Sequence, residues 1–337
     1  MSILITGAGL VGSYAAAQLA AMGEKPVLFD VAPPWENLQR VPGLETVKVV
    51  RGDILDFPDL ARVIKEKGVD RIIHTAAFLT AGARARPYAA VKVNILGTVN
   101  ILEAARLLGV SRVVFTSSAT VYYSTYSTRQ DDPQEEDFAL RAISQRPSGV
   151  YPTTKLACEH LGLNYRDLYG IDFVVVRFAG VFGPWLGPVA GLPGMALKQL
   201  AERPLREQVV TVGRDLVWAG QEDFLYMKDA ARSTVLACLA PKLDPEKRPV
   251  PVYNVSMGRS YEFEEVIEIL QEIYPKTEFQ VKMGEVASAG GYPDIPKRPM
   301  DLSRSRQELG YEPEFKMDEA LRDYRQWLET LGGSLAS

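Results

Sequence analysis

The stretch that decides the fold is ILITGAGLVG, residues 3–12. Its first four residues are apolar or β-branched and predict a short buried strand. Gly7, Gly9 and Gly12 follow with the G-x-G-x-x-G spacing of a turn that leads from a strand into a helix. The first glycine would allow the tight turn, the second the approach of a phosphate group to the backbone, and the third close packing of the helix on the strand. We therefore expect a dinucleotide-binding α/β domain.

The residues after this turn indicate which dinucleotide binds. Leu10 and Val11 would open the helix, whose positively polarised amino terminus then faces the pyrophosphate. Asp30 ends the next predicted strand, 18 positions after Gly12. A carboxylate at that place accepts both ribose hydroxyls of NAD and repels the 2′-phosphate of NADP. Residues 31–34, Val-Ala-Pro-Pro, offer no cation for that phosphate. The sequence therefore predicts NAD.

Short apolar runs alternate with helical patterns through the first half of the chain. The runs are rich in Val and Ile and nearly continuous, as in parallel strands that helices cover on both faces. This alternation predicts a doubly wound parallel sheet of the Rossmann type. The predicted strands are Ile3–Thr6, Pro26–Asp30, Val47–Val50, Arg71–His74, Arg112–Thr116 and Phe173–Arg177, and the predicted helices are Val11–Met22, Asp59–Lys67, Pro87–Leu108 and Tyr151–Tyr169.

The second half of the chain has a different pattern. We expect residues 1–178 to form the dinucleotide-binding domain and residues 179–337 a smaller α/β lobe for the substrate, with the chain crossing between the lobes. Two stretches interrupt the pattern and are expected to border the substrate cleft: Tyr122–Gly149, a polar surface loop, and the irregular Gly180–Gly194. The elements predicted after Gly194 are helices at Met195–Ala201, Asp229–Leu239, Glu262–Ile273 and Asp318–Leu331, with strands at Val252–Val255 and Glu278–Val281.

Composition excludes several classes of partner. The 337 residues carry a net charge of −4 without a basic cluster, which argues against nucleic acid as a partner. The Ala-rich stretch at 11–22 is too short to cross a bilayer, and no basic leader precedes the first strand, so we expect a cytoplasmic protein.

Cys158 and Cys238 lack metal-ligand spacing and are expected to be reduced thiols. His74 and His160 lie in no motif, so no metal site is expected and His74 is interpreted as structural.

Two short motifs carry the candidate catalytic groups. Ser118 lies in TSSATVY, residues 116–122, and Tyr151 and Lys155 lie in YPTTK, residues 151–155. Residues four apart share a helix face, and a nearby ammonium lowers the pKa of a phenol that is otherwise a poor base at neutral pH. We expect Tyr151 to exchange a proton with the substrate, Lys155 to lower its pKa and hold the nicotinamide ribose, and Ser118 to hydrogen-bond the reacting oxygen.

Together with NILGTVN at 94–100 and RFAGVFGP at 177–184, these motifs resemble the extended short-chain dehydrogenase/reductases. That group includes the UDP-galactose 4-epimerases and short-chain L-threonine dehydrogenases, and the resemblance runs from Ile3 to about Tyr311. It implies a homodimer in which the helices matching 87–108 and 151–169 form a four-helix bundle. The further site residues that it implies are Asp53 and Ile54 at the adenine, Ala76 and Ala77 at ribose and phosphate, Asn94, Phe178 and Val181 elsewhere at the cofactor, and Thr120 and Arg298 at the substrate.

The chain departs from the family pattern where the substrate binds. Dehydratases carry acidic residues just after the catalytic serine, where this chain has Ala119 and Thr120, so we do not expect dehydration. Nucleotide-sugar epimerases present an Asn where this chain has Gly180. They place an Arg, which meets the diphosphate, where this chain has Glu222. Arg298 remains as a cation for a phosphate or carboxylate.

Three functions stay open on this basis. We favour net oxidation or reduction of a secondary alcohol or ketone of a small hydroxylated substrate, sugar-like or hydroxy-acid-like, with NAD exchanged at each turnover. The alternative is a sugar or nucleotide-sugar 4-epimerase that retains its NAD. A catalytically inactive NAD-sensing protein is the third possibility, and the intact Ser118, Tyr151 and Lys155 argue against it.

Overall fold

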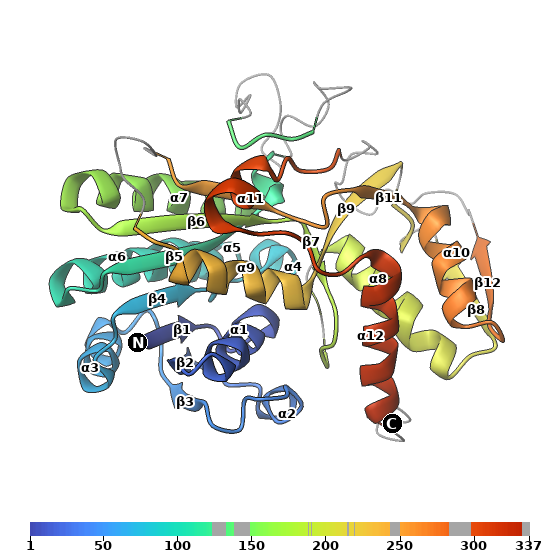
Figure 1. Cartoon of the computed structure of the whole chain (residues 1–337), viewed down its shortest axis with the longest axis horizontal. Helices are drawn as coiled ribbons and strands as arrows, with labels where there is room; N and C mark the ends of the chain where they lie inside the picture. Colours follow the sequence, from blue (N-terminus) through green and yellow to red (C-terminus); the bar gives the residue numbers. More distant parts are fainter. Residues whose placement is uncertain are drawn as a thin grey trace.

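The larger lobe is built on one parallel sheet with helices on both faces (Figure 1). The computed structural model describes residues 1–122, 133–137, 149–187, 189, 191–213, 216–218, 220–242, 250–282 and 298–331. The seven strands have the order β10-β6-β5-β4-β1-β2-β3, which reverses direction beside β1, as in doubly wound sheets. They are β1 (Ser2–Thr6), β2 (Lys25–Asp30), β3 (Lys48–Arg51), β4 (Arg71–His74), β5 (Arg112–Ser118), β6 (Asp172–Phe178) and β10 (Val252–Val255).

The apolar strands are explained by burial on both faces of the sheet. In β1 the side chains of Ile3, Leu4 and Ile5 are all fully buried. Ile3 and Ile5 join one apolar cluster and Leu4 joins the other, because successive side chains point to opposite faces. The helices of the larger lobe are α1 (Leu10–Ala21), α2 (Trp35–Leu38), α3 (Phe57–Lys67), α4 (Thr80–Ala85), α5 (Pro87–Val91), α6 (Gly97–Leu108), α7 (Val150–Tyr169), α9 (Met227–Leu239) and α11 (Ser303–Leu309).

The smaller lobe lies at the carboxyl ends of the strands, on the right of Figure 1. It has a three-stranded sheet, β11-β9-β7, and a two-stranded sheet, β12-β8. Strand β10 and helix α9 return to the larger lobe, so the chain crosses between the lobes. The elements of the smaller lobe are β7 (Gly180–Phe182), α8 (Leu192–Glu202), β8 (Val209–Gly213), β9 (Gln221–Tyr226), β11 (Ser260–Glu262), α10 (Phe263–Ile273), β12 (Glu278–Lys282) and α12 (Met317–Thr330).

The predicted doubly wound sheet is confirmed, and the corrections concern irregular segments. The helix expected at 87–108 is interrupted by a π-helical turn at Lys92–Leu96. Gly180–Gly194 was expected to lack regular structure, but it contains β7 and the start of α8. Most of Tyr122–Gly149 lies outside the described residues. Within 133–137, however, Gln134 and Glu136 are buried, which corrects the expectation of a surface loop there.

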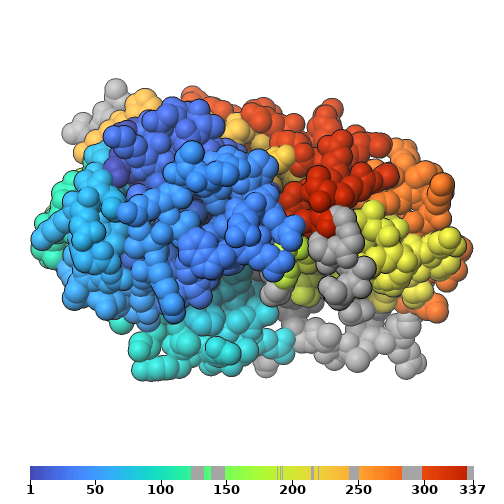
Figure 2. All heavy atoms as spheres, turned by 90° about the horizontal axis from the view of Figure 1, so that it is seen from below, coloured from blue at the N-terminus to red at the C-terminus, as the bar shows by residue number. Residues whose placement is uncertain are grey.

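Direct hydrogen bonds join the two lobes beside α1 and α2. The Asn37 side chain makes two with the backbone of Leu186, receiving one from the Leu186 N–H at 2.7 Å and donating one to the Leu186 carbonyl at 3.2 Å. Within the larger lobe, Gln18 of α1 donates to the carbonyl of Lys228 in α9, the helix that directly follows β9 of the smaller lobe. Figure 2 shows the blue amino-terminal region side by side with the red carboxyl-terminal helix on this face. Among the described helices, none has the length and apolarity to span a bilayer.

Candidate active site

The glycine turn after β1 has the geometry that its sequence predicts. Gly7 has a φ of 90°, in the left-handed region, and a Cβ there would lie 2.8 Å from the nitrogen of Ala76. A Cβ on Gly12 would lie 2.1 Å from the carbonyl oxygen of Gly7. A Cβ on Gly9 would meet nothing within 4 Å. Packing therefore requires the first and third glycines, and the second borders open space at the amino terminus of α1, where a pyrophosphate fits.

The other predicted cofactor residues lie at the same edge of the sheet. Asp30 ends β2, and its carboxylate accepts the N–H groups of Ala8 and Ala32, both at 2.8 Å. Asp53 follows β3 and accepts the N–H of Leu55 at 2.9 Å. The remaining residues of this set are Leu10 and Val11 in the first turn of α1, Ile54 after Asp53, and Ala76 and Ala77 after β4; Ile54 is buried and the other four are half-buried.

Tyr151 and Lys155 lie one turn apart near the start of α7. The Lys155 ammonium is buried and donates to the carbonyl of Thr116 in β5 at 2.6 Å. It lies 4.7 Å from the ring centroid of Phe115 and 5.7 Å from that of Tyr151. Burial lowers the pKa of Lys155 to about 8. The Tyr151 ring itself is 8% exposed.

Ser118 ends β5, beside the start of the turn at Ala119–Tyr122. Its Oγ accepts hydrogen bonds from the Thr120 N–H at 3.2 Å and the Thr120 hydroxyl at 3.1 Å. A serine oxygen accepts at most two hydrogen bonds, so the Ser118 hydroxyl keeps its own hydrogen for a third group. Thr120, predicted to contact the substrate, is buried and orients Ser118.

Asn94 lies in the π-helical turn and connects two parts of the site. Its Oδ1 accepts the N–H of Phe78 at 2.7 Å, and its Nδ2 donates to the Phe78 carbonyl at 3.0 Å and to the Thr154 hydroxyl at 2.9 Å. Phe78 follows β4, and Thr154 directly precedes Lys155. The described contacts of the Asn94 side chain are therefore with the protein, and they fix α7 against the cofactor edge of the sheet.

Residues 3–256 match the family described as the NAD dependent epimerase/dehydratase family. The chain belongs to this family. NAD is its cofactor, as Asp30 predicts, and the protein is an enzyme of the extended short-chain dehydrogenase/reductase type. The glycine turn, with open space at Gly9 and a carboxylate at the end of β2, fits that cofactor.

Named relatives of this family member include both epimerases and dehydrogenases. A UDP-glucuronate 4-epimerase from Thermodesulfobacterium geofontis is 29% identical over 303 residues, which are 89% of this chain and 84% of the relative. A solved UDP-glucose 4-epimerase from Thermus thermophilus, in complex with NAD, is 25% identical with a TM-score of 0.77, covering 98% of this chain and 99% of the other. An L-threonine dehydrogenase from Clostridium difficile has a TM-score of 0.81 at 24% identity, covering 98% of each chain, and shares the fold.

The smaller lobe of this epimerase/dehydratase-family chain brings two carboxyl groups into its interior. Glu222 and Asp223 lie in β9 and are 5% and 4% exposed. Asp223 accepts the N–H of Met300 at 2.8 Å, and burial raises the pKa of Asp223 to about 8. A Cβ on Gly180 would lie 3.3 Å from the Asp223 carbonyl oxygen, so a larger residue at 180 needs its neighbours to move.

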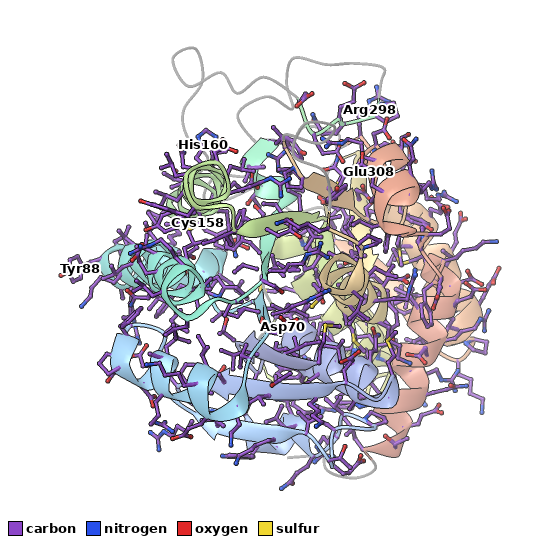
Figure 3. All side chains as sticks on the ribbon, turned by 60° about the vertical axis from the view of Figure 1, so that its left-hand side comes forward. Asp70, Tyr88, Cys158, His160, Arg298 and Glu308 are labelled. Atoms are coloured by element: carbon purple, nitrogen blue, oxygen red, sulfur yellow. The ribbon has the colours of Figure 1, made fainter. Side chains whose placement is uncertain are left out.

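The other predicted contacts lie around this lobe. Phe178 ends β6 and is buried, and Val181 in β7 is half-buried. Arg298, labelled near the top of Figure 3, begins the last described segment and is half-buried two residues before Met300. The structure thus places Arg298 on the segment that Asp223 holds, and its role toward the substrate stays a prediction.

A buried ion pair behind the catalytic helix was not anticipated. Glu159 lies four residues after Lys155, on the same face of α7, and is 1% exposed. Arg177 of β6 donates to both of its carboxylate oxygens, at 3.0 Å and 2.6 Å, and Ser117, next to Ser118, donates to it at 2.5 Å. The Lys-x-x-x-Glu spacing places Glu159 on the Lys155 face of α7, but no local pattern connects Glu159 to Arg177 of β6.

The ion pair continues into residues 133–137. Arg177 also donates to the Tyr122 hydroxyl at 2.6 Å and to the Glu136 carbonyl at 2.9 Å. Tyr122 in turn donates to Asn254 of β10 at 2.8 Å. The backbone N–H of Asn254 donates to the Glu136 carboxylate at 2.8 Å, and its side chain to the Gln134 carbonyl at 2.7 Å. A continuous buried network therefore joins the catalytic helix to residues 133–137.

The histidines and cysteines have protein partners or face away from the site. His74 is buried between the hydroxyls of Thr6, at 2.6 Å, and Thr98, at 3.0 Å. Cys158 donates to the Asn94 carbonyl from the inner side of α7, whereas His160 lies on its outer side (Figure 3). Within the described ranges no three His, Cys, Asp or Glu side chains gather as metal ligands, and Cys158 and Cys238 are free thiols.

Proposed function

We propose that the protein is an NAD-dependent dehydrogenase that interconverts a secondary alcohol and a ketone on a small hydroxylated substrate, sugar-like or hydroxy-acid-like. The observation that carries this proposal is the buried Lys155 ammonium, which lies between β5 and the ring of Tyr151. Ser118, at the end of the same strand, has a hydroxyl hydrogen to offer. Ala119 and Thr120 directly follow Ser118, where dehydratases carry acidic residues, so dehydration is not expected.

In the oxidising direction, the Tyr151 phenolate removes the proton from the substrate hydroxyl. Ser118 hydrogen-bonds the same oxygen and holds it within reach of Tyr151. The Lys155 ammonium stabilises the phenolate and binds the nicotinamide ribose, so that proton transfer is tied to the bound cofactor. Bound NAD would supply the hydride acceptor for the carbon that carries this oxygen.

Residues of the smaller lobe favour a dehydrogenase that releases its cofactor after each turnover over an epimerase that retains NAD. An epimerase must hold a keto intermediate while it rotates and then return the hydride to the opposite face. A nucleotide diphosphate would be the anchor for that step, and an Arg fork binds one well. Here Glu222 occupies the position at which these epimerases place that Arg. A Cβ on Gly180 would lie 3.3 Å from the Asp223 carbonyl oxygen and 3.4 Å from Pro193. A carboxylate repels a diphosphate.

A 4-epimerase of nucleotide sugars is the second candidate. It is supported by the UDP-glucuronate 4-epimerase from Thermodesulfobacterium geofontis, to which the chain is similar over most of its length. The same Ser118, Tyr151 and Lys155 would serve in both reactions. The two candidates differ in whether reduced cofactor leaves the protein.

We expect NAD to be lost from the purified protein on dialysis, and NADH to form when the dialysed protein receives fresh NAD and its alcohol substrate. The measurement is absorbance of NADH over a panel of polyols, hydroxy acids, aldonates and nucleotide sugars. Cofactor that survives dialysis, with interconversion of UDP-glucose and UDP-galactose or of the corresponding uronates and no net NADH, would establish the epimerase instead. NAD binding without either reaction would favour the sensor.

We also propose a homodimer, formed through α5, α6 and α7. Their outer surface exposes apolar side chains, among them Tyr88 at 77% and Leu168 at 69%; Tyr88 projects from the edge of the molecule in Figure 3. Exposed groups of this size on adjoining helices are typical of an interface.

Buried free thiols are typical of proteins in a reducing compartment, and we propose that this protein is located in the cytoplasm.

Light scattering at micromolar concentration is expected to give twice the 37.2 kDa mass of one chain. The double variant Tyr88→Glu, Leu168→Glu should give the monomer mass, because two charges would enter the apolar interface. Met22→Glu is the matched control, since Met22 is 61% exposed at the end of α1 and should leave the dimer intact. A monomer mass for the native protein would refute the proposal.

A further inference from the structure

The structure places an arginine beside the carboxylate that selects NAD. Strand β3 pairs in parallel with β2, and in this register Arg51 lies opposite Asp30. Arg51 is exposed, and its Nε donates to the carbonyl of Val31, the residue that follows Asp30, at 3.2 Å. The guanidinium therefore lies against the backbone that leaves β2 at the adenosine ribose. Residues 31–34 contain no cation, and Arg51 lies 21 positions after Asp30 in the sequence, so local sequence alone does not reveal it.

The Asp30 carboxylate is hydrogen-bonded to the glycine turn and to the backbone just after β2. Its two oxygens accept the N–H groups of Ala8 and Ala32. In the part of the chain that the structure describes, the Arg51 side chain has one recorded hydrogen bond, from Nε, and its two terminal nitrogens have none. Those nitrogens form the fork that binds a phosphate with two parallel hydrogen bonds.

We propose that Arg51 is placed to bind a 2′-phosphate on the adenosine ribose, so that the charge of Asp30 is what excludes NADP from the native protein. The ribose 2′-position lies next to the carboxylate that binds its hydroxyls. A phosphate at this position meets the negative charge of Asp30 on one side and the positive charge of Arg51 on the other. Removing the carboxylate leaves the cation in place, and one substitution then suffices to admit NADP.

This inference depends on the NAD site and is independent of the proposed substrate. The test is calorimetry of NAD and NADP binding to the full chain freed of bound nucleotide. Asp30→Ala is expected to raise the affinity for NADP at least about 10-fold, because the repulsion is gone and a charge-assisted hydrogen bond remains. Asp30→Ala, Arg51→Ala should lose that gain. Arg51→Lys in the Asp30→Ala background should keep part of it, since the charge stays and the fork is lost.

The matched control is Asp30→Ala, Arg62→Ala. Arg62 is an exposed arginine on α3 that pairs with Asp59 and Glu66, so the variant removes the same charge elsewhere. It should keep the full gain in NADP affinity. Asp30→Asn replaces Asp30→Ala if the latter unfolds, because an amide oxygen still accepts one backbone N–H. NADP affinity that stays unchanged in both Asp30 variants, or that survives loss of Arg51, would overturn the proposal.

Discussion

Replacing Tyr151 with Phe is expected to lower turnover at least about 100-fold while NAD affinity stays within about three-fold. The substitution removes the proton-transfer oxygen and keeps the ring, which packs among Phe78, Ala83 and Ala90. The fold and the cofactor turn should therefore be unaffected. The measurements are the turnover number with the alcohol found in the substrate screen, and calorimetry for NAD.

Two companion variants separate the roles of the other groups. Ser118→Ala should reduce turnover less than Tyr151→Phe, because it removes one hydrogen bond to the reacting oxygen and leaves the base. Lys155→Ala should weaken both turnover and NAD binding, since we propose that its ammonium stabilises the phenolate and holds the nicotinamide ribose. If Tyr151→Phe keeps more than about a tenth of native turnover, another group transfers the proton.

Acid is expected to destabilise the native protein through His74. Burial, with a smaller contribution from the Lys155 charge, lowers the pKa of His74 from 6.5 to about 3. The unfolded chain binds a proton between these values and the folded chain does not, so the free energy of unfolding falls as the pH drops below 6.5. The loss from this one group is about 2 kcal/mol at pH 5 and about 3 kcal/mol at pH 4.

The measurement is urea unfolding of native protein and His74→Gln between pH 7 and pH 4. The variant starts less stable, because the buried contacts to Thr6 and Thr98 change, but its stability should decline less steeply with acid. His160→Asn is the matched control, since His160 is exposed on α7 and its replacement should leave the native slope. Equal slopes for His74→Gln and the native protein would show that His74 is not the acid-sensitive group.

The sequence was informative where function depends on local spacing. The glycine turn, the carboxylate at the end of β2, and the four-residue separation of Tyr151 and Lys155 each describe a single turn or strand end. Their geometry follows from backbone rules, and the structure places them at one edge of the sheet. The sheet itself was predictable because strands buried on both faces must be apolar throughout.

The features that the sequence did not predict depend on contacts between residues far apart in the chain. The register of β2 and β3 places Arg51 opposite Asp30, and Arg177 of β6 forms an ion pair with Glu159 of α7. The strands of the smaller lobe are short and partly polar, so their periodicity is weak. Gln134 and Glu136 lie in a polar stretch, and their burial depends on hydrogen bonds from Asn254 that no local pattern reveals.

Residues 133–137 have a practical consequence for recombining this chain with its relatives. Gln134 exchanges backbone hydrogen bonds with Pro299 and Asp301, and Glu136 binds Asn254. A chimera that replaces 123–148 as one block deletes these contacts and leaves the Asn254 amide without its carboxylate. In such a chimera, residues 133–137, β10 and residues 298–302 should therefore all come from the same parent protein.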